Sequence, residues 1–330
     1  MPRAGSETGL AVRHFDVFNG DADGICALRQ LRLAEPLEAT LVTGLKRDIA
    51  LLEDLPAVRG DRVTVLDVSL DRNREALGAL LDRGVQVRYF DHHYAGTVPS
   101  HPGLFAVIDE SGALCTSALV DRYLEGRYRA WAVVGAFGDN LPEAAVELAQ
   151  PLALDADALE TLRELGECLN YNAYGETPAD VLVPPAQLYR LASGYADPVS
   201  LAKEEPTIAR LARERVADLH RALESRPLRS WPAADAYLLP DAAWSRRVSG
   251  TFANRLALTE PHRAHAVLTP ARNGAYIVSV RAPRGGGVSA VEFCRRFATG
   301  GGRALAAGID RLEGARLEGF LDEFSRAWKR

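Results

Sequence analysis

The triplet Asp91-His92-His93 constrains the fold of this chain more than any other feature. It follows directly on residues 85–90, an apolar run with β-branched and aromatic side chains that predicts a strand. One acid and two imidazoles are therefore delivered where the backbone leaves a sheet. These side chains together indicate a metal site, which needs further ligands from elsewhere in the chain.

Three further acidic positions come directly after predicted elements. Asp21-Ala22-Asp23-Gly24 follows a strand over residues 13–18, Asp67 follows a strand over 62–66, and Asp139 follows an apolar helix over 129–137. Strands that alternate with helices at this spacing predict right-handed βαβ units and a mostly parallel sheet with helices on both faces. Because ligands bind beyond the carboxyl ends of such strands, these side chains can converge although they are far apart in sequence.

The chemistry of these groups favours Mn²⁺ or Mg²⁺, since carboxylates with one or two imidazoles are ligands of hard to borderline divalent ions. Four or five acids in one place repel one another unless cations neutralise them. Two ions about 3.5–4 Å apart would stabilise both the attacking and the leaving oxygen of a phosphoryl displacement. Taken singly, each aspartate could be a helix cap or a turn former. Together they predict one site that holds two divalent cations and cleaves a phosphoester.

Composition bounds the other possibilities. The 330 residues suggest two domains, and 47% hydrophobic with 25% charged residues indicates a globular chain. The net charge of -5 gives no general attraction to nucleic acid or to an anionic membrane, so a polyanion would need local basic residues or metal. The four cysteines form no CxxC pair, which favours reduced thiols and a cytoplasmic protein. Residues 1–9 lack the apolar core of a signal peptide, and no run predicts a membrane span.

The chain divides into three predicted regions. A catalytic, metal-binding domain is expected over residues 10–195, a helical linker over 196–232, and a smaller α/β domain that binds substrate over 233–330. Within the first, residues 39–43 predict a strand and residues 48–55 a short helix. Within the last, residues 264–268 and 276–281 predict a hairpin around the Asn273-Gly274 turn signal.

With these motifs in place, the chain resembles the DHH phosphoesterase superfamily, including its DHH-associated C-terminal domain. Four segments are similar to the four motifs of this superfamily, in chain order: Asp21-Ala22-Asp23-Gly24, Val65-Leu66-Asp67, Asp91-His92-His93 and Gly138-Asp139-Asn140. Residues 300–308 are similar to its glycine-rich signature. The resemblance covers nearly the whole chain. It implies that Asp21 binds one Mn²⁺, that Asp23, His92 and Asp139 bind the other, and that Asp67 bridges the two. His93 would contact the scissile phosphate, and Asp91 would fix an imidazole tautomer. The loop Gly300-Gly301-Gly302 would bind the phosphate end of the substrate.

The sequence departs from the family pattern in two places. Asn19 stands where a further His or Asp often precedes the first motif, and its carbonyl oxygen can ligate but brings no charge. Arg303 stands where the glycine-rich loop usually continues with His, and its guanidinium group fits a phosphate bidentately. Arg281, at a predicted strand end, is a further candidate for substrate binding.

The resemblance therefore implies an Mn²⁺-dependent phosphoesterase, with Mg²⁺ as the other candidate ion. Its expected substrates are short single-stranded oligonucleotides, which would make it a nuclease, or 3′-phosphoadenosine 5′-phosphate. Two alternatives stay open: an exopolyphosphatase or pyrophosphatase, and a nucleotide-binding regulator with weakened catalysis, given Asn19 and Arg303. The chain is expected to be cytoplasmic and to have no membrane partner, and it could act as a homodimer.

Overall fold

The computed structural model describes residues 12–285 and 287–329. The prediction that residues 1–9 form no signal peptide lies outside the described residues. So do residues 10, 11 and 330, which belong to the predicted domains. The chain divides into two compact units, which are described separately. Residues up to Gly166 together with 185–199 form unit 1, and residues 167–184 together with those from Ser200 onward form unit 2. The division passes through helices α6 (Ala156–Ala173) and α8 (Pro198–Glu204).

Unit 1 is built around a five-stranded sheet in the order β2-β1-β3-β4-β5, and all of its pairs are parallel. The strands are β1 (His14–Asn19), β2 (Thr40–Gly44), β3 (Arg62–Leu66), β4 (Gln86–Asp91) and β5 (Leu104–Ile108). The helices are α1 (Ala22–Ala34), α2 (Arg74–Asp82), α3 (Thr116–Tyr123), α4 (Arg129–Gly138), α5 (Pro142–Ala149), the first part of α6, and α7 (Pro185–Ser193).

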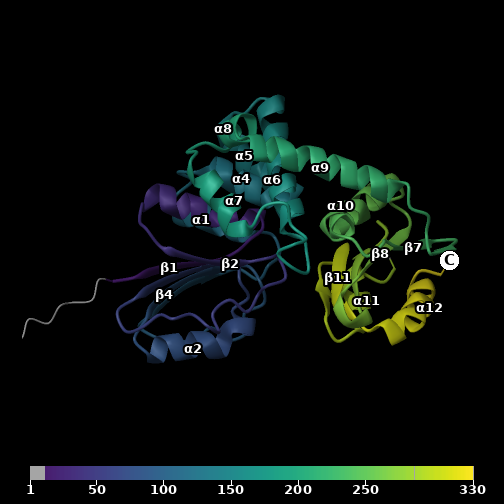
Figure 1. The fold of residues 1–330 in the computed structure, drawn as a ribbon, viewed down its shortest axis with the longest axis horizontal. Helices are drawn as coiled ribbons and strands as arrows, with labels where there is room; N and C mark the ends of the chain where they lie inside the picture. Colours follow the sequence, from purple (N-terminus) through teal and green to yellow (C-terminus); the bar gives the residue numbers. More distant parts are fainter. Residues whose placement is uncertain (1–11, 286, 330) are drawn as a thin grey trace, which may run out of the picture. The chain divides into compact units, whose positions relative to one another are not determined.

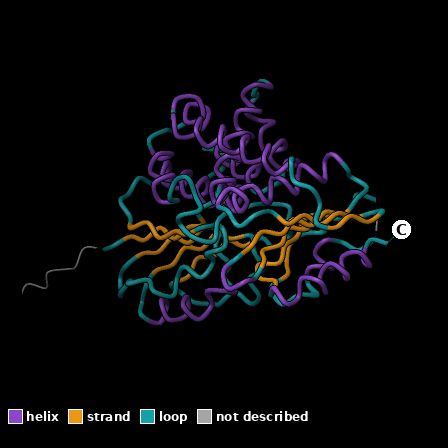
Figure 2. Tube along the Cα trace, turned by 45° about the vertical axis from the view of Figure 1, so that its right-hand side comes forward, coloured by secondary structure: helices purple, strands orange, loops and turns teal. Residues whose placement is uncertain are grey.

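Helices cover both faces of this sheet, with α2 on one side and α1, α4 and α7 on the other (Figure 1). The strand residues that face α2 are apolar, and Val65 packs there with Leu77 and Leu80 in one buried cluster. On the opposite face, α1 is buried nearly all round because it contacts α3, α4 and α7. The strands lie between helical layers in a second view as well (Figure 2), and their amino and carboxyl ends form the two rims of the unit 1 sheet.

The turn from β1 into α1 explains the spacing of the first acidic motif. Asp21 is the N-cap of α1, since its Oδ1 atom accepts hydrogen bonds from the backbone N–H groups of Asp23 (3.0 Å) and Gly24 (3.1 Å). The turn also passes close to β2, because a Cβ atom on Gly20 would lie 2.2 Å from the carbonyl oxygen of Gly44. The motif therefore begins a helix almost directly after the strand ends, and both carboxylates stay at the rim.

Helix α4 lies against its neighbours at glycine residues. A Cβ atom on Gly138 would lie 2.2 Å from the Cβ atom of Ala22 in α1 and 2.8 Å from the carbonyl oxygen of Gly166 in α6. One on Gly135 would lie 2.1 Å from the Oγ atom of Ser117 in α3. Any side chain at these two positions would separate the helices, so glycine is required for their close contact.

Unit 2 contains a six-stranded sheet in the order β10-β11-β9-β8-β7-β6, in which β7 and β8 are parallel and the other pairs antiparallel. The strands are β6 (Arg229–Trp231), β7 (Ala234–Leu238), β8 (Ala264–Pro270), β9 (Tyr276–Arg281), β10 (Gly300–Gly302) and β11 (Ala306–Leu312). The remaining helices are α9 (Pro206–Leu223), α10 (Ala243–Thr259), α11 (Ala290–Cys294) and α12 (Leu317–Ala327).

One face of this second sheet packs on α11 and α12 through an aromatic cluster that includes Phe293, Phe320 and Phe324. The other face contacts α10. Helix α10 is tied to α9 by the buried ion pair of Arg247 with Asp218, 2.9 Å apart. Unit 2 thus has its own core on both sides of its sheet.

The predicted fold class is confirmed: a mostly parallel sheet with helices on both faces is followed by a smaller α/β unit. The hairpin around Asn273-Gly274 is also observed, as the antiparallel pair of β8 and β9. The prediction of a short helix over residues 48–55 is wrong, because these residues form turns and a loop. None of the helices in the described part of the chain has the length and apolar character needed to cross a membrane. A cytoplasmic location and a homodimer stay predictions.

Candidate metal centre

The carboxyl rim of the unit 1 sheet gathers the predicted acids. Asp67 follows β3 and turns the chain with a positive φ of 58°, a conformation that aspartate tolerates better than most residues. Its backbone N–H group donates to the carbonyl oxygen of Phe90, which ties the turn to β4. Its side chain is buried, and its Oδ1 atom accepts a hydrogen bond from the hydroxyl group of Thr116 at 3.3 Å. The left-handed turn therefore aims the Asp67 carboxylate into the rim.

His92 points its Nε2 atom at two of these carboxylates. Nε2 lies 3.3 Å from Oδ1 of Asp67 and 3.9 Å from Oδ2 of Asp139. The other ring nitrogen, Nδ1, lies 3.1 Å from the carbonyl oxygen of Leu114. Because a carbonyl oxygen can only accept, Nδ1 carries the proton, and a neutral His92 then offers its Nε2 lone pair toward the acids. This is the orientation that a metal-binding imidazole adopts.

His93 is held by Asp91 rather than by the carboxylate cluster alone. Its Nδ1 atom lies 2.7 Å from Oδ1 of Asp91 and 3.8 Å from Oδ1 of Asp67. Asp91 is fully buried, and its Oδ1 atom also accepts from the backbone N–H group of His92 at 2.9 Å. The side chain of His93 is 40% exposed, so its ring can be approached from solvent. Asp91 thus orients His93 from behind while His93 faces outward.

Asp23 and Asp139 approach the cluster from helix ends. Both oxygens of Asp23 accept hydrogen bonds from the first N–H groups of α3, those of Thr116 at 2.6 Å and Ser117 at 2.8 Å. A helix N-terminus favours a negative charge at this point. Asp139 is the C-cap of α4, and its backbone N–H group donates to the carbonyl oxygen of Gly135.

The last of the predicted acids, Asp21, contacts a lysine that the sequence analysis did not single out. Oδ2 of Asp21 forms an ion pair with Lys46, which lies just past β2, and Nζ of Lys46 is also 3.7 Å from Oδ1 of Asp139. Asn19 braces this arrangement, because its Oδ1 atom accepts from the backbone N–H group of Asp21 (3.2 Å) and its Nδ2 atom donates to the carbonyl oxygen of Lys46 (3.2 Å). Lys46 follows a strand end as Asp67 does, but a lysine is not a metal ligand of the kind that pointed to the acids.

The pKa values show an excess of buried negative charge. Burial raises the pKa of Asp67 well above its usual range, and the charges of Asp21 and Asp23 raise it further. Burial also raises the pKa of Asp23. Burial alone would lower the pKa of His92, but the hydrogen bond with Asp67 and the charge of Asp139 raise it to about 10. Burial would likewise raise the pKa of Asp21, but Lys46 opposes this and the net shift is downward.

This donor set fits a divalent cation. One ligand atom from each of Asp67, His92 and His93 lies within 4.8 Å of the others, and Asp139 is in reach of His92. Buried carboxylates with raised pKa values would hold a cation in place of their protons. Oxygen ligands with imidazole suit Mn²⁺ or Mg²⁺. Asp67, His92 and Asp139 are therefore the residues that would hold such an ion, and the resemblance adds Asp23 to them.

The predicted substrate-binding residues other than Asn19 lie in unit 2. Arg281, at the end of β9, donates to the side-chain oxygen of Asn254 (2.7 Å) and to the carbonyl oxygen of Gly250 (3.4 Å), and burial lowers its pKa. Gly300, Gly301 and Gly302 form β10 rather than a loop. A Cβ atom on Gly300 would lie 1.7 Å from the carbonyl oxygen of Cys294, whereas Gly301 faces open space. Arg303 follows, and its backbone N–H group donates to the carbonyl oxygen of Ala306. Gly300 thus has a packing role, and Gly301 is the glycine that a ligand could approach.

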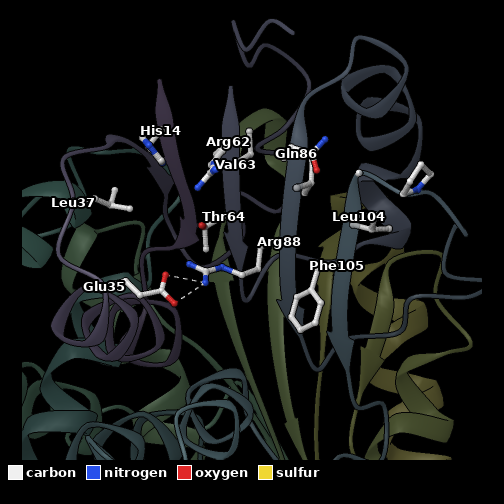
Figure 3. Close-up of a pocket in the computed structure, with 13 residues that line it drawn as sticks. His14, Glu35, Leu37, Arg62, Val63, Thr64, Gln86, Arg88, Leu104 and Phe105 are labelled. Carbon is white, nitrogen blue, oxygen red and sulfur yellow. Dashed lines mark hydrogen bonds and ion pairs between the residues drawn. The ribbon is translucent and has the colours of Figure 1, made fainter. Parts of the chain in front are cut away.

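A hollow of about 490 Å³ lies at the opposite rim of the unit 1 sheet, where β1, β3, β4 and β5 begin (Figure 3). It is lined by residues that include His14, Arg62 and Phe105, and by Arg88, which pairs with Glu35 at 2.9 Å. None of the clustered acids lines it. The clustered acids and the hollow therefore lie at opposite ends of the same sheet.

Comparison with known proteins gives the fold an independent test. No family model matches this chain, and no curated protein matches it by sequence. Solved structures do match. A structure of the exonuclease RecJ bound to manganese is 20% identical with a TM-score of 0.59, and the match covers 96% of this chain and 90% of that one. A DHH domain from a protein described as a member of a ribosomal protein family is 15% identical with a TM-score of 0.63, and the match covers 96% of this chain and 86% of that one. A pGpG-specific phosphodiesterase from Vibrio cholerae is 14% identical with a TM-score of 0.53, and the match covers 96% of this chain and 100% of that one.

These identities are low, so the likeness is one of fold. The matches cover 96% of this chain and therefore extend over both of its units. The resemblance to the DHH superfamily is confirmed at this level: the chain has the fold of the DHH-domain proteins.

Proposed function

We propose that this protein is a divalent-cation-dependent phosphoesterase that hydrolyses a terminal phosphoester of a small phosphorylated substrate. The observation that carries the proposal is the meeting of Asp67, His92 and Asp139 at one rim, with Nε2 of His92 within 4 Å of both carboxylates. The fold supports it, since solved structures of this fold include proteins described as an exonuclease and a phosphodiesterase.

Mn²⁺ is the ion we assign, because carboxylate and imidazole ligands suit it and because one of the similar structures is described as bound to manganese. When bound, such an ion supplies Lewis-acid stabilisation of the charge that develops on phosphoryl oxygens. Asp23, Asp67, His92 and Asp139 would hold it. Leu114 contributes by fixing the His92 tautomer through its carbonyl oxygen.

His93 is the residue we assign to proton transfer. Asp91 accepts a hydrogen bond from Nδ1 of His93, which leaves Nε2 as the atom that gains or loses a proton. Burial lowers the pKa of His93, but the bond with Asp91 outweighs this and raises it, which favours the imidazolium form. A protonated Nε2 at a half-exposed position can neutralise a phosphate oxygen or protonate the leaving oxygen.

For unit 2 we propose a substrate-binding role, and with it the division into a catalytic domain (10–195), a linker (196–232) and a substrate domain (233–330). The guanidinium group of Arg281 donates to the side-chain oxygen of Asn254 and to the carbonyl oxygens of Gly250 and Val280, and burial lowers its pKa. A phosphate group would stabilise such a guanidinium group. Arg303 and the open position at Gly301 would bind the same end of the substrate.

A substrate panel tests the proposal. The purified chain with Mn²⁺ is incubated with pGpG, longer RNA oligomers, 3′-phosphoadenosine 5′-phosphate and polyphosphate, and the products are separated by chromatography. Release of mononucleotide or of inorganic phosphate from the nucleotides is the expected result. Turnover of polyphosphate alone would favour the exopolyphosphatase alternative. Tight nucleotide binding with no turnover of any substrate would favour the regulator and refute the proposal.

His93→Gln tests the residue assignment within the same assay. The variant keeps a polar side chain at the rim but cannot carry the proton, so kcat should fall by about 10²- to 10⁴-fold while Mn²⁺ binding persists. His220→Gln is the matched control, because His220 is an exposed histidine on α9 with 75% of its side chain accessible. Equal turnover of the two variants would remove His93 from the mechanism.

A further inference from the structure

Lys46 bridges two acids that the family resemblance assigns to different metal ions. Its ammonium group forms an ion pair with Asp21, the expected ligand of the first ion, and lies 3.7 Å from Asp139, an expected ligand of the second. The side chain is 23% exposed, so the charge is largely enclosed by the rim. A cation supplied by the protein itself therefore lies where the carboxylates converge.

Asp21 has both carboxylate oxygens engaged in this arrangement. Oδ1 caps α1 by accepting from the N–H groups of Asp23 and Gly24, and Oδ2 contacts Lys46. A divalent ion on Oδ2 would meet the ammonium group at close range and be repelled by it. An ion on Oδ1 would compete with the two hydrogen bonds that begin the helix.

Asn19 is engaged in the same way at both ends of its amide. Its oxygen accepts from the N–H group of Asp21, and its nitrogen donates to the carbonyl oxygen of Lys46. Asn19 therefore positions the lysine loop against Asp21. Asp48 fixes the other side of that loop, since its Oδ2 atom accepts from the N–H group of Leu45 at 2.8 Å. The departure from the family pattern at Asn19 and the presence of Lys46 are thus parts of one arrangement.

We propose that the ammonium group of Lys46 takes the place of the first cation, so that the site binds one divalent ion on the side of Asp67, His92 and Asp139. This inference rests on the proposed cation-dependent function and departs from the two-ion arrangement that the resemblance implies. The lysine gives Asp21 a permanent partner. The acids around His92 keep the requirement for an added ion, because one ligand atom from each of Asp67, His92 and His93 lies within 4.8 Å of the others and Asp139 is 3.9 Å from Nε2 of His92.

The stoichiometry of Mn²⁺ binding tests the proposal without any measurement of activity. Isothermal titration calorimetry should give about one Mn²⁺ per wild-type chain, and low-temperature electron paramagnetic resonance should show an isolated ion. The double variant Asn19→Asp/Lys46→Ala frees Asp21 and adds a carboxylate. It should bind about two ions, with the spin coupling of a pair about 3.5–4 Å apart.

Lys203→Ala is the matched control, since Lys203 is an exposed lysine on α8, and it should bind as wild type does. Two coupled ions in the wild-type chain would overturn the proposal and leave the phosphoesterase standing. One ion in both wild type and double variant would also overturn it, because Lys46 would then not be what excludes the second ion. No Mn²⁺ binding and no turnover in wild type would instead remove the proposed function, and this inference with it. If the double variant does not fold, Lys46→Met provides the same comparison.

Discussion

Both rims of the unit 1 sheet carry charged side chains, but they balance the charge differently. At the amino end, carboxylates and guanidinium groups pair one to one: Asp16 with Arg32, Asp61 with Arg13, and Glu35 with Arg88. At the carboxyl end, four aspartates gather around Lys46 and His92. The hollow of about 490 Å³ lies at the amino end (Figure 3), and the ion pair on its wall, Arg88 with Glu35, needs no further partner.

This difference separates structural from functional charge. A buried pair with matched partners is complete in the folded chain, whereas clustered acids with raised pKa values are stabilised by a proton or a cation from outside. A search for a functional site by the shape of the surface alone would therefore select the amino end of the sheet, where the charges are already paired. Substitutions confined to one rim can assign each effect to one end of the sheet.

The largest effect is expected for Asp67→Asn at the carboxyl rim. Asparagine tolerates the positive φ of 58° but removes the charge that a cation needs. Turnover should fall by about 10⁴-fold, the loss expected when several kcal/mol of charge stabilisation are withdrawn. Mn²⁺ binding by calorimetry should weaken in parallel, while the melting temperature should not fall. Unchanged Mn²⁺ affinity would contradict the assigned role of Asp67.

At the amino rim, Asp16→Ala should act on stability alone. It leaves the guanidinium group of Arg32 buried without its carboxylate partner, which costs about 3–5 kcal/mol of folding free energy. Urea unfolding measures this loss. The folded variant should bind as many Mn²⁺ ions as wild type, and a lower stoichiometry would mean that the two rims are not independent.

The pH dependence of stability should report on the carboxyl rim through His92, and this effect is expected to be smaller than the two above. The pKa of His92 is raised from its ordinary 6.5 to about 10, so its protonated form contributes stability that is complete below pH 6.5 and lost as the pH rises through 10. The melting temperature of the metal-free chain should therefore fall across that window. Saturating Mn²⁺ binds the neutral imidazole and should oppose the fall. A metal-free melting curve that is flat from pH 6.5 to 10 would argue against this charge balance.

The smallest effect is expected for Glu35→Gln. The Glu35 side chain is 42% exposed, so its pair with Arg88 at the rim of the hollow contributes about 0–1 kcal/mol. Turnover and Mn²⁺ stoichiometry should equal those of wild type. A loss of activity beyond about twofold would show that the hollow takes part in function, and the contrast between the rims would then be wrong.

Much of this arrangement followed from the sequence because parallel strands bring their carboxyl ends to one edge. Asp67 and Asp91 could be placed together without any contact information, since each follows a predicted strand. Lys46 obeys the same rule, but a single lysine past a strand is common and carries no chemistry until Asp21 and Asp139 are seen beside it.

Other features depend on partners that no local pattern indicates. Residues 48–55 have helical composition, yet their backbone is held by the side chain of Asn73 instead. Its oxygen accepts from the N–H group of Leu52, 21 positions away, and its nitrogen donates to the carbonyl oxygen of Ile49. Gly300, Gly301 and Gly302 form a strand only because β11 follows and pairs with them. In both cases a contact with another segment determined the outcome.

The glycine contacts of α4 have a consequence for how such a protein can change. Because Gly138 brings the main chain of α4 against the methyl group of Ala22, the two helices that carry Asp23 and Asp139 are separated there by a glycine and a single methyl group. Many residues inside unit 1 could be exchanged during divergence while these two carboxylates stay in register. One additional methyl group at position 138 would displace them both.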